Sequence, residues 1–536
     1  MKKALIHPFL FGLAPAMMML ASNVSQVMLS DTLRSFLSSL LLTLLLLVPA
    51  RFVLKSWPKA ALITTLLLIL LFSYGHVFSM LHGLNIGPVL VGRTIVVLPA
   101  FFLLVGLGAW AMLRRRSALD QWTQMFNVIG IFLLAAPAVS VSSYYIRGAI
   151  IESARPPDVP FELARTFQGE VPNIYYIVLD MRARSDVLHG IYGYDDSAFI
   201  DELESLGFYV AAQSASNYSS TLQSLSSSMN FEYINYLQDT YGSSSNNRAP
   251  LGLLLADNKI TKVLMTLGYK TGAFKTNDFY TEFRSADVYI KPTPNQVRQY
   301  QNFWSLNSFE GIFLRTTLAR VLFDVGIASG NRVLENTIES PYRLHRLTIL
   351  NIIDHLPDFA KMKDPYFVFA HIVSPHPPYV FGPNGEELEH SEPFSLSGPA
   401  RQNGGPRALK LYIDQLQYID ELVLNAIRKI LAQSKTPPII IFQSDHGPVS
   451  YSGDDEILQS NMKEQHGILN AYFFPNGKYD LLYPSVSPVN SFRIVLNTFF
   501  GEDYELLPDR HYFIPHGRPY DFIVVTDRVK SDPLAP

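Results

Sequence analysis

The amino-acid sequence predicts an α/β protein in two parts: a bundle of five transmembrane helices, followed by an α/β domain with a mainly parallel central sheet. The first part rests on five apolar runs before residue 147, each close to the roughly 20 residues that cross a bilayer. The second rests on later apolar runs of strand length that alternate with helical patterns. A chain of 536 residues also exceeds the roughly 250 to 300 residues that one core supports, which favours separate domains.

Composition narrows the chemistry. Charged residues make up 17% of the chain and the formal net charge is -3, so no basic domain points to a nucleic-acid partner. Cysteine is absent, which excludes disulfides, thiolate metal sites and a cysteine nucleophile.

The five predicted transmembrane helices cover residues 9–29, 36–54, 60–80, 89–113 and 126–146. Polar residues interrupt the first run between Ser22 and Gln26, so a signal peptide is the alternative interpretation of that run. A retained helix is favoured, because the apolar stretch is too long for a signal peptide and four further spans follow it.

The positions of Lys and Arg predict the orientation in the membrane. With the N-terminus in the cytoplasm, the cytoplasmic side receives Lys2, Lys3, Arg51, Lys55, Lys59 and Arg114–Arg116, and the opposite loops offer only Arg34. Five spans then carry the rest of the chain to the outer side. We expect a transmembrane domain over 1–146, a linker with some helix along the bilayer surface over 147–172, and an extracytoplasmic domain over 173–536.

Three apolar runs in the second part are typical of buried parallel strands. Residues 173–179 end at Asp180, residues 366–373 end near His376, and residues 438–443 are followed by Ser444, Asp445 and His446. In doubly wound sheets, ligands bind beyond the carboxyl ends of the strands. The polar residues after these strands are therefore candidates for a functional site.

The sequence Asp445-His446-Gly447 is the sharpest local signal. A carboxylate and an imidazole beyond a buried strand can both face one cation, and glycine permits a tight backbone turn behind them. A helix cap with a surface histidine is the alternative. Asp180, at the end of another strand, favours the metal site because two carboxylates and an imidazole would converge at one sheet edge.

The serine-rich segment 216–230 offers a hydroxyl nucleophile. A Thr221 hydroxyl bound to a divalent cation would lose its proton easily, and the N-terminus of a helix would favour an approaching anion. Ordinary serine-rich capping is the alternative, and by chemistry alone Ser219, Ser220 and Ser224 compete with Thr221.

Two further histidines are candidates. His376 is flanked by prolines after a strand, and His466 precedes the apolar run 468–474; each is predicted to bind a second metal, hold substrate phosphate or protonate a leaving group. A bland core or surface histidine is the alternative, and His371, within its strand, is expected to be a hydrogen-bonded core residue. The cations proposed for phosphate binding, each with a structural ion pair as the alternative, are Arg182, Arg184, Lys275 and Arg493.

Four segments together resemble the alkaline phosphatase superfamily, and within it the membrane-anchored, sulfatase-like transferases that include lipoteichoic acid synthase and the phosphoethanolamine transferases. They are Tyr192-Gly-Tyr-Asp195, Asn217-Tyr-Ser-Ser-Thr221, Ser444-Asp-His-Gly447 and Ser487-Pro-Val-Asn-Ser-Phe-Arg493. The resemblance covers nearly the whole chain. It implies that Asp180, Thr221, Asp445 and His446 bind the catalytic metal, that Thr221 is the nucleophile, and that His376 and His466 bind substrate phosphate or a second metal.

The resemblance also implies a function. A phosphoglycerol or phosphoethanolamine head group would pass from a phospholipid donor, through a covalent phosphothreonine, to a glycan or lipid of the bacterial cell envelope. The protein would be integral to the cytoplasmic (inner) membrane, with its catalytic domain in the periplasm. One divalent metal is expected, with the mixed oxygen and nitrogen ligands favouring Zn or Mn over Mg, and a site with a second metal is the alternative.

Three departures and two rivals bear on this function. The transferases usually carry glutamate where this chain has Asp180, whereas hydrolytic relatives often carry aspartate. Asp180 therefore weakens the choice of a transferase over a hydrolase. A formylglycine sulfatase is disfavoured because threonine cannot be converted and the Cys/Ser-x-Pro-x-Arg pattern is missing; the lack of an Asp-x-x-x-His pair favours one metal. The rivals are a membrane-anchored phosphatase or phosphodiesterase, and a non-catalytic membrane binding protein.

Overall fold

The computed structural model describes residues 4–24, 27–81, 84–86, 89–90, 92–114, 119–153, 171–301, 305–322, 332–390, 394–396, 405–449, 457 and 460–534. The chain divides into two compact units. The first contains residues 1–153, 302–341 and 390–394, and the second contains residues 154–301, 342–389 and 395–536. Two segments from within the expected extracytoplasmic range 173–536 thus group with the N-terminal helices.

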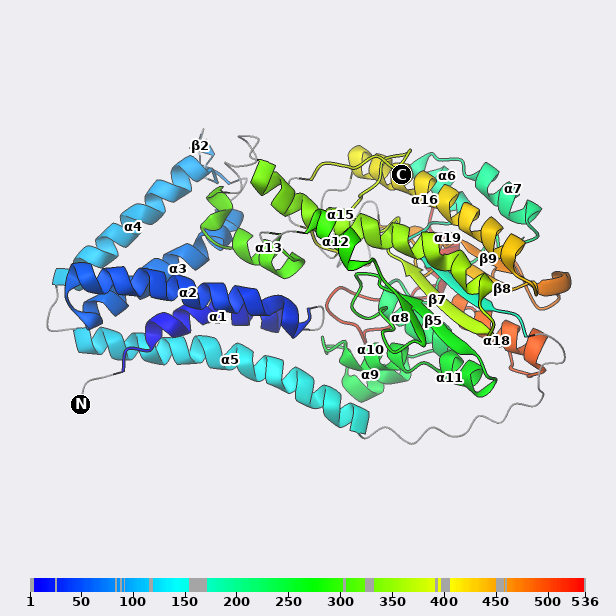
Figure 1. The fold of residues 1–536 in the computed structure, drawn as a ribbon, viewed down its shortest axis with the longest axis horizontal. Helices are drawn as coiled ribbons and strands as arrows, with labels where there is room; N and C mark the ends of the chain where they lie inside the picture. The colour runs from blue at the N-terminus through cyan, green and yellow to red at the C-terminus, as the bar shows by residue number, and fades with distance from the viewer. Residues whose placement is uncertain are drawn as a thin grey trace. The chain divides into compact units, whose positions relative to one another are not determined.

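Long apolar helices form most of the first unit (Figure 1). They are α1 (His7–Ser22), α2 (Leu29–Leu54), α3 (Trp57–Leu81), α4 (Thr94–Arg114) and α5 (Leu119–Ser153), with a short hairpin of β1 (Asn85–Ile86) and β2 (Val89–Leu90) before α4. Four helices, α2 to α5, are long and apolar enough to cross a membrane. The first has 16 residues, so a count of four to five spans is supported.

The predicted helix bounds need correction. The first run was expected to reach Leu29, but α1 ends at Ser22, and Leu29 begins α2, which was expected to start only at Phe36. The fourth run was expected to begin at Val89, but Val89 lies in β2 and α4 begins at Thr94. The fifth helix was expected to end at Ile146, but α5 continues to Ser153. Residues 154–170, which make up most of the predicted linker over 147–172, lie outside the described residues.

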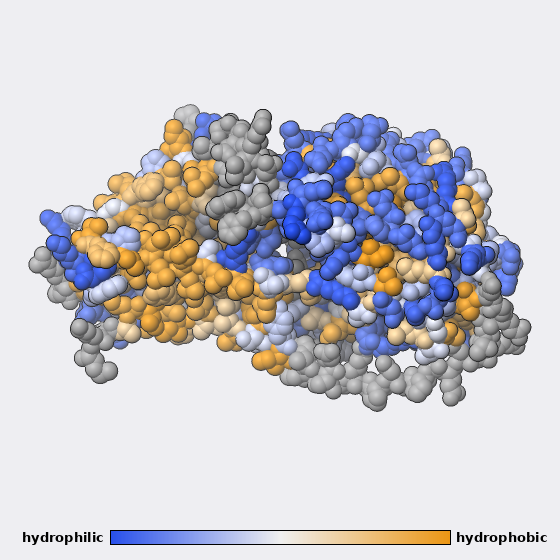
Figure 2. Space-filling model, viewed as in Figure 1, coloured by the Kyte–Doolittle hydropathy of each residue, from blue (hydrophilic) through white to orange (hydrophobic). Residues whose placement is uncertain are grey.

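The helical surface of this unit is hydrophobic. Figure 2 shows apolar side chains over most of the helices on the face it presents. Leu41 on α2 is 57% exposed and Phe132 on α5 is 71% exposed. Exposed apolar area on this scale is typical of a surface that faces lipid rather than water.

A seven-stranded sheet forms the centre of the second unit, in the order β4-β9-β8-β3-β7-β5-β6. Its strands are β3 (Ile174–Leu179), β4 (Tyr209–Val210), β5 (Lys270–Phe274), β6 (Val288–Ile290), β7 (Tyr366–Ile372), β8 (Ile439–Ser444) and β9 (Asn470–Phe473). Neighbouring strands from β8 to β6 pair in parallel, whereas β9 pairs antiparallel with β8 and with β4. The mainly parallel sheet agrees with the prediction. A separate two-stranded sheet joins β10 (Tyr512–Phe513) to β11 (Ile523–Val524).

Helices cover both faces of the central sheet (Figure 1). The α-helices that begin in or belong to the second unit are α6 (Ser185–Tyr192), α7 (Ser197–Ser205), α8 (Thr221–Asn230), α9 (Tyr236–Tyr241), α10 (Ala249–Ala256), α11 (Lys259–Thr266), α12 (Pro294–Tyr300), α16 (Pro406–Gln433), α17 (Met462–His466), α18 (Pro488–Phe500) and α19 (Thr526–Ser531). The remaining elements are α13 (Ser308–Arg315) in the first unit, α15 (Arg332–His355) across the unit boundary, and the 3-10 helices η2 (Leu356–Lys361) and η4 (Pro475–Gly477).

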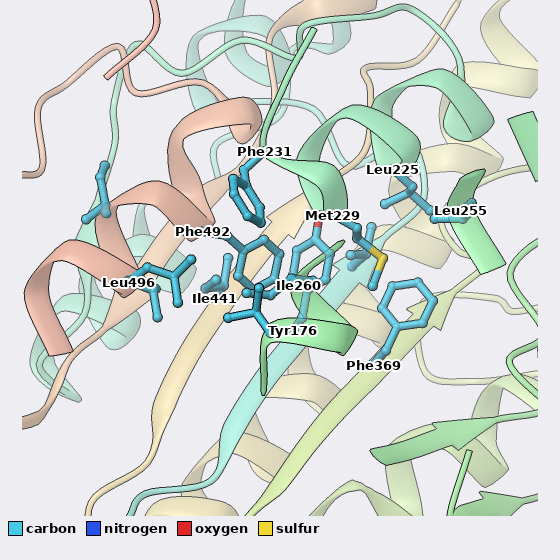
Figure 3. Close-up of a cluster of buried hydrophobic side chains, with 14 of the residues drawn as sticks. Tyr176, Leu225, Met229, Phe231, Leu255, Ile260, Phe369, Ile441, Phe492 and Leu496 are labelled. Atoms are coloured by element: carbon cyan, nitrogen blue, oxygen red, sulfur yellow. The ribbon is translucent and has the colours of Figure 1, made fainter. Parts of the chain in front are cut away.

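The largest hydrophobic cluster fills the space between the sheet and helices α8, α10, α11 and α18 (Figure 3). Alternate residues of β3 point into it, because successive side chains of a strand face opposite sides of the sheet. Tyr176 is one of them, and its hydroxyl reaches Ser228 of α8 at 2.9 Å. This packing fixes α8, which begins at Thr221, against the sheet.

Candidate active site

The register of the parallel strands brings the two candidate carboxylates together. In β3, Leu179 lies opposite Ser444 of β8 and Ile372 of β7. Asp180 and Asp445, the next residues along their strands, therefore leave the same edge of the sheet side by side. The backbone of Met181 then turns with φ of 66°, and its N–H donates to Oδ1 of Asp445 at 3.2 Å.

Asp180, Asp445 and His446 form a cluster suited to a cation. One ligand atom from each lies within 4.8 Å of the other two, and all three side chains are buried. Within the described part of the chain, Oδ2 of Asp445 has no hydrogen-bond partner. A buried carboxylate oxygen without a partner is costly, and a divalent cation would remove that cost. The residues present therefore fit a metal ion.

The ring of His446 is oriented by the backbone of the next residue, Gly447. Nδ1 lies 2.8 Å from the carbonyl oxygen of Gly447. A carbonyl can only accept, so in the neutral ring Nδ1 carries the proton and Nε2 presents a lone pair. That Nε2 lies 3.2 Å from Oγ1 of Thr221, 3.8 Å from Asp180 Oδ1 and 3.7 Å from Asp445 Oδ2.

Gly447 has a steric role in this turn. A Cβ at that position would lie 2.0 Å from the carbonyl oxygen of Glu464, closer than real Cβ atoms approach. The N–H of Gly447 also donates to the carbonyl of Gln465 at 2.7 Å. Only glycine lets the chain pass this close to α17 directly behind His446.

Thr221 is the first residue of α8 and is half-buried. Its neighbours in the serine-rich segment have other partners: Ser224 Oγ donates to the carbonyl of Asp445 at 2.6 Å, and Ser219 Oγ accepts from the N–H of Ile514 at 2.9 Å. The structure thus brings Thr221, and neither Ser219 nor Ser224, next to the imidazole. Its hydroxyl also stands at a helix N-terminus, where backbone N–H groups favour an anion.

His376 lies beside the cluster. It follows β7, is buried, and its backbone N–H donates to the carbonyl of Asp180 at 3.1 Å. Its Nδ1 contacts the carbonyl oxygen of Pro377. The main chain that leads to His376 is therefore tied to the same strand end as the carboxylates.

His466 is fully buried in a different setting. Its Nδ1 lies 3.0 Å from the carbonyl of Met462 and its Nε2 lies 3.3 Å from the carbonyl of Tyr512. Its ring centroid is 6.0 Å from that of His511, a histidine that no sequence motif indicates. Burial and the neighbouring His511 lower the pKa of His466 to about 3. The described contacts hold this ring between backbone carbonyls.

The four proposed phosphate-binding cations have structural partners. Arg182 is fully buried between Asp196 and Asp420, at 2.8 and 2.9 Å. Arg184 pairs with Asp186 and donates to the carbonyl of Ser214, and Lys275 lies 3.8 Å from Glu282. Arg493 donates to the carbonyls of Phe231 and Glu505. In each case the structure contains the ion-pair or structural contacts that were the alternative prediction.

His371, inside strand β7, borders the cluster of Asp180, Asp445 and His446. Its Nε2 lies 3.6 Å from Asp180 Oδ2, and its Nδ1 lies 2.9 Å from Oγ1 of Thr281. Burial lowers the pKa of His371, which favours the neutral ring. It is a hydrogen-bonded core residue, as expected. His371 is the last residue but one of β7, and this place near the strand's carboxyl end is the sequence feature that indicates its proximity to the site.

The chain is similar in fold to several solved structures at low sequence identity. Among solved structures it is similar to the C-terminal periplasmic domain of EcEptC from Escherichia coli, at 12% identity and a TM-score of 0.42, covering 70% of this chain and 96% of that one. It is also similar to the integral membrane protein lipooligosaccharide phosphoethanolamine transferase A from Neisseria meningitidis, at 12% identity and a TM-score of 0.36, covering 93% and 95%.

The sequence comparisons give one match. No curated protein matches the chain at a significant level. The Sulfatase family model matches residues 172–486, which is more than half of the 536 residues. This match spans Asp180, Thr221, His376, Asp445, His446 and His466. The chain therefore belongs to the sulfatase family.

Proposed function

We propose that this protein transfers a phospholipid-derived phospho-head-group to a cell-envelope glycan or lipid, with Thr221 as the nucleophile. One observation carries the proposal: the Thr221 hydroxyl stands at the N-terminus of α8, 3.2 Å from Nε2 of His446 and beside two buried carboxylates. Membership in the sulfatase family and four helices able to cross a membrane support it.

The residues that would hold the metal are Asp180, Asp445, His446 and Thr221. Carboxylate, imidazole and hydroxyl ligands favour zinc or manganese over magnesium. A divalent cation held there would make the threonine hydroxyl easier to deprotonate and would neutralise charge on the phosphoryl oxygens. His376 and His466 are proposed to hold substrate phosphate or a second metal; for His376, its backbone bond to Asp180 supports a place beside the substrate.

The proposed reaction has two balanced steps. In the first, Thr221 Oγ1 forms a bond to phosphorus, the bond from phosphorus to the lipid alcohol breaks, and the threonine proton ends on that alcohol. In the second, an acceptor hydroxyl attacks the phosphothreonine, Thr221 leaves, and the acceptor proton returns to it. In both steps, N–H groups at the start of α8 would face the phosphoryl oxygens.

The apolar helices would hold the catalytic domain at the membrane that contains the phospholipid donor. A phospholipid donor stays in the bilayer, so the enzyme that uses it must be held there as well. We propose that the protein lies in the bacterial inner membrane with its N-terminus in the cytoplasm and its catalytic domain in the periplasm. Phosphoglycerol and phosphoethanolamine are the two proposed head groups.

The first test uses the full-length protein in vesicles with a phospholipid labelled in its head group. We expect diacylglycerol release to rise when an acceptor alcohol is added, with the label recovered on the acceptor, and to vanish in Thr221→Ala. Release that is independent of acceptor and yields free head-group phosphate would instead establish the hydrolase alternative. Failure to bind metal, together with no release, would favour the non-catalytic alternative.

A further inference from the structure

Residues 302–341 lie in the sequence of the catalytic domain but belong to the unit of membrane helices. Helix α13 packs against α2 through a buried carboxylate: Arg34 Nε donates to Glu310 at 2.6 Å, and Glu310 is 4% exposed. A second Arg34 nitrogen donates to the carbonyl of Ser305, and Asn307 donates to the carbonyl of Asp31 at 2.8 Å. These bonds attach the segment to the first turns of α2.

The chain after α13 joins the hydrogen-bond ladder of α3. In an undisturbed helix, the N–H of Gly75 binds the carbonyl of Leu71. Here Gly75 donates to the carbonyl of Thr316 at 3.0 Å, and Leu71 accepts from the N–H of Leu318 at 2.7 Å. A Cβ on residue 75 would lie 2.2 Å from the carbonyl oxygen of Arg315, so glycine is required for this approach.

The point of contact lies well inside the apolar helix. Helix α3 ends at Leu81, and ten residues of helix separate it from Leu71, a distance of about 15 Å along the axis. That is about half the thickness of a hydrocarbon core. Phe313 continues the contact by packing on Phe72, with ring centroids 5.7 Å apart. The segment that includes Phe313, Thr316 and Leu318 thus packs near the middle of α3, a helix long and apolar enough to cross a membrane.

This arrangement forms an apolar cavity of about 540 Å³ within the first unit, open on one side. Helices α2, α3 and α4 form one part of its wall, and the segment from Phe313 to Leu322 forms the rest. Representative lining residues are Ser38, Leu42, Phe72, Phe102, Leu318 and Leu322. A volume of this size is in the range of ligand pockets, about 300 to 1,000 Å³.

We propose that this cavity holds an acyl chain of a glycerophospholipid. The wall is formed largely by membrane helices, so the surroundings that fill the cavity are lipid rather than water. Phe102 and Leu322, at 59% and 68% exposure, line it and also face outward, which gives a chain a way in from the bilayer. The lining is almost wholly apolar, with Ser38, Ser39 and Thr317 as its polar residues, and this composition fits the hydrocarbon part of a lipid.

The inference rests on the proposed function in one respect, the identification of the bound lipid with the phosphoryl donor. The presence of the lipid and its role as donor are therefore measured separately. Ser38→Phe fills the cavity from α2, and Ser30→Phe makes the same substitution at an exposed position of that helix outside the cavity lining.

Occupancy is tested by photolabelling. The full-length protein is placed in vesicles that contain a phosphatidylethanolamine with a mid-chain diazirine, and labelled peptides are mapped by mass spectrometry. We expect label on residues 313–322, reduced at least about fivefold by Ser38→Phe and unchanged by Ser30→Phe. Equal labelling of the three proteins, or label confined to outward-facing positions such as Leu41, would overturn the proposal.

The donor role is tested by kinetics on the same proteins. Ser38→Phe is expected to raise KM about tenfold for the phospholipid, and to leave unchanged the KM for a water-soluble diester with the same head group. Lost labelling with an unchanged phospholipid KM would contradict the donor role and identify a structural lipid. Labelling of a wild-type protein that turns over no donor would uphold the cavity assignment and count against the proposed function.

Discussion

Oγ1 of Thr221 lies 3.2 Å from Nε2 of His446, and Nδ1 of the same ring lies 2.8 Å from the carbonyl of Gly447. The second contact sets the tautomer that leaves a lone pair on Nε2. The hydroxyl is therefore next to a nitrogen that can accept its proton or share a cation with it. Four predictions follow from this site and from the domain that supports it.

Thr221→Ala is expected to lower head-group transfer by on the order of 10³-fold or more, because the covalent step loses its nucleophile. Thr221→Ser keeps a hydroxyl and should stay within about tenfold of the wild type. Rates are measured with a labelled phospholipid, and bound metal is measured on the same samples. Full turnover by Thr221→Ala would contradict the assignment.

Asp445→Asn is expected to lower metal affinity by more than about 100-fold, since even outer partners of metal ligands contribute about 10- to 100-fold. The reason is that the substitution replaces the buried carboxylate of Asp445 with a neutral amide. Oδ2 of that carboxylate lies in the cluster and has no hydrogen-bond partner among the described residues, so it is available to a cation. Titration calorimetry with zinc or manganese measures the change. Asp186→Asn, which removes an exposed carboxylate paired with Arg184, is the matched control and should bind metal normally.

Arg182→Met is expected to destabilise the catalytic domain by about 3 to 5 kcal/mol, because Asp196 and Asp420 are left buried without their shared cation. Burial already raises the pKa of Asp420 to about 6. Arg428→Met, which breaks the exposed pair with Glu202, should cost less than about 1 kcal/mol. Thermal unfolding of the full-length proteins compares the two. Equal midpoints would show that the buried group is not a structural support.

Acid is expected to destabilise the same domain through His345, whose pKa burial lowers to about 4. The unfolded chain takes up a proton near pH 6.5, so this contribution is fully present above that pH and is lost as the pH falls toward 4. The loss is about 1.4 kcal/mol per pH unit in that window. His345→Gln should flatten the dependence of the unfolding midpoint between pH 7 and pH 5. An identical slope in variant and wild type would refute the assignment.

The part of the site that could be predicted from the sequence is the part set by strand ends. Asp180 and Asp445 follow apolar runs that had to be buried, and parallel pairing then placed them together. Thr221 needed the resemblance, because nothing in the serine-rich segment alone distinguishes it from Ser224. In the structure, Thr221 begins α8 and contacts His446, whereas Ser224 lies one turn later and donates to the carbonyl of Asp445.

Other features depend on contacts that local patterns do not contain. The run 468–474 resembles the parallel strands in composition, yet β9 is antiparallel, since direction follows from the connection and not from hydropathy. The packing of residues 305–322 on the apolar helices of the first unit depends on pairs such as Arg34 with Glu310, which lie far apart in the sequence. Arg493 is a further case, because the Phe231 carbonyl to which it donates is 262 residues away in the sequence.

The central claim is a covalent phosphothreonine at Thr221. The purified full-length protein, loaded with zinc or manganese, is incubated with a phospholipid labelled in its head group, and the peptide containing Thr221 is analysed by mass spectrometry. The account predicts a head-group phosphate on Thr221 that is absent from Thr221→Ala and is discharged by an acceptor alcohol. A metal-loaded protein that gives neither adduct nor turnover with any phospholipid would contradict it.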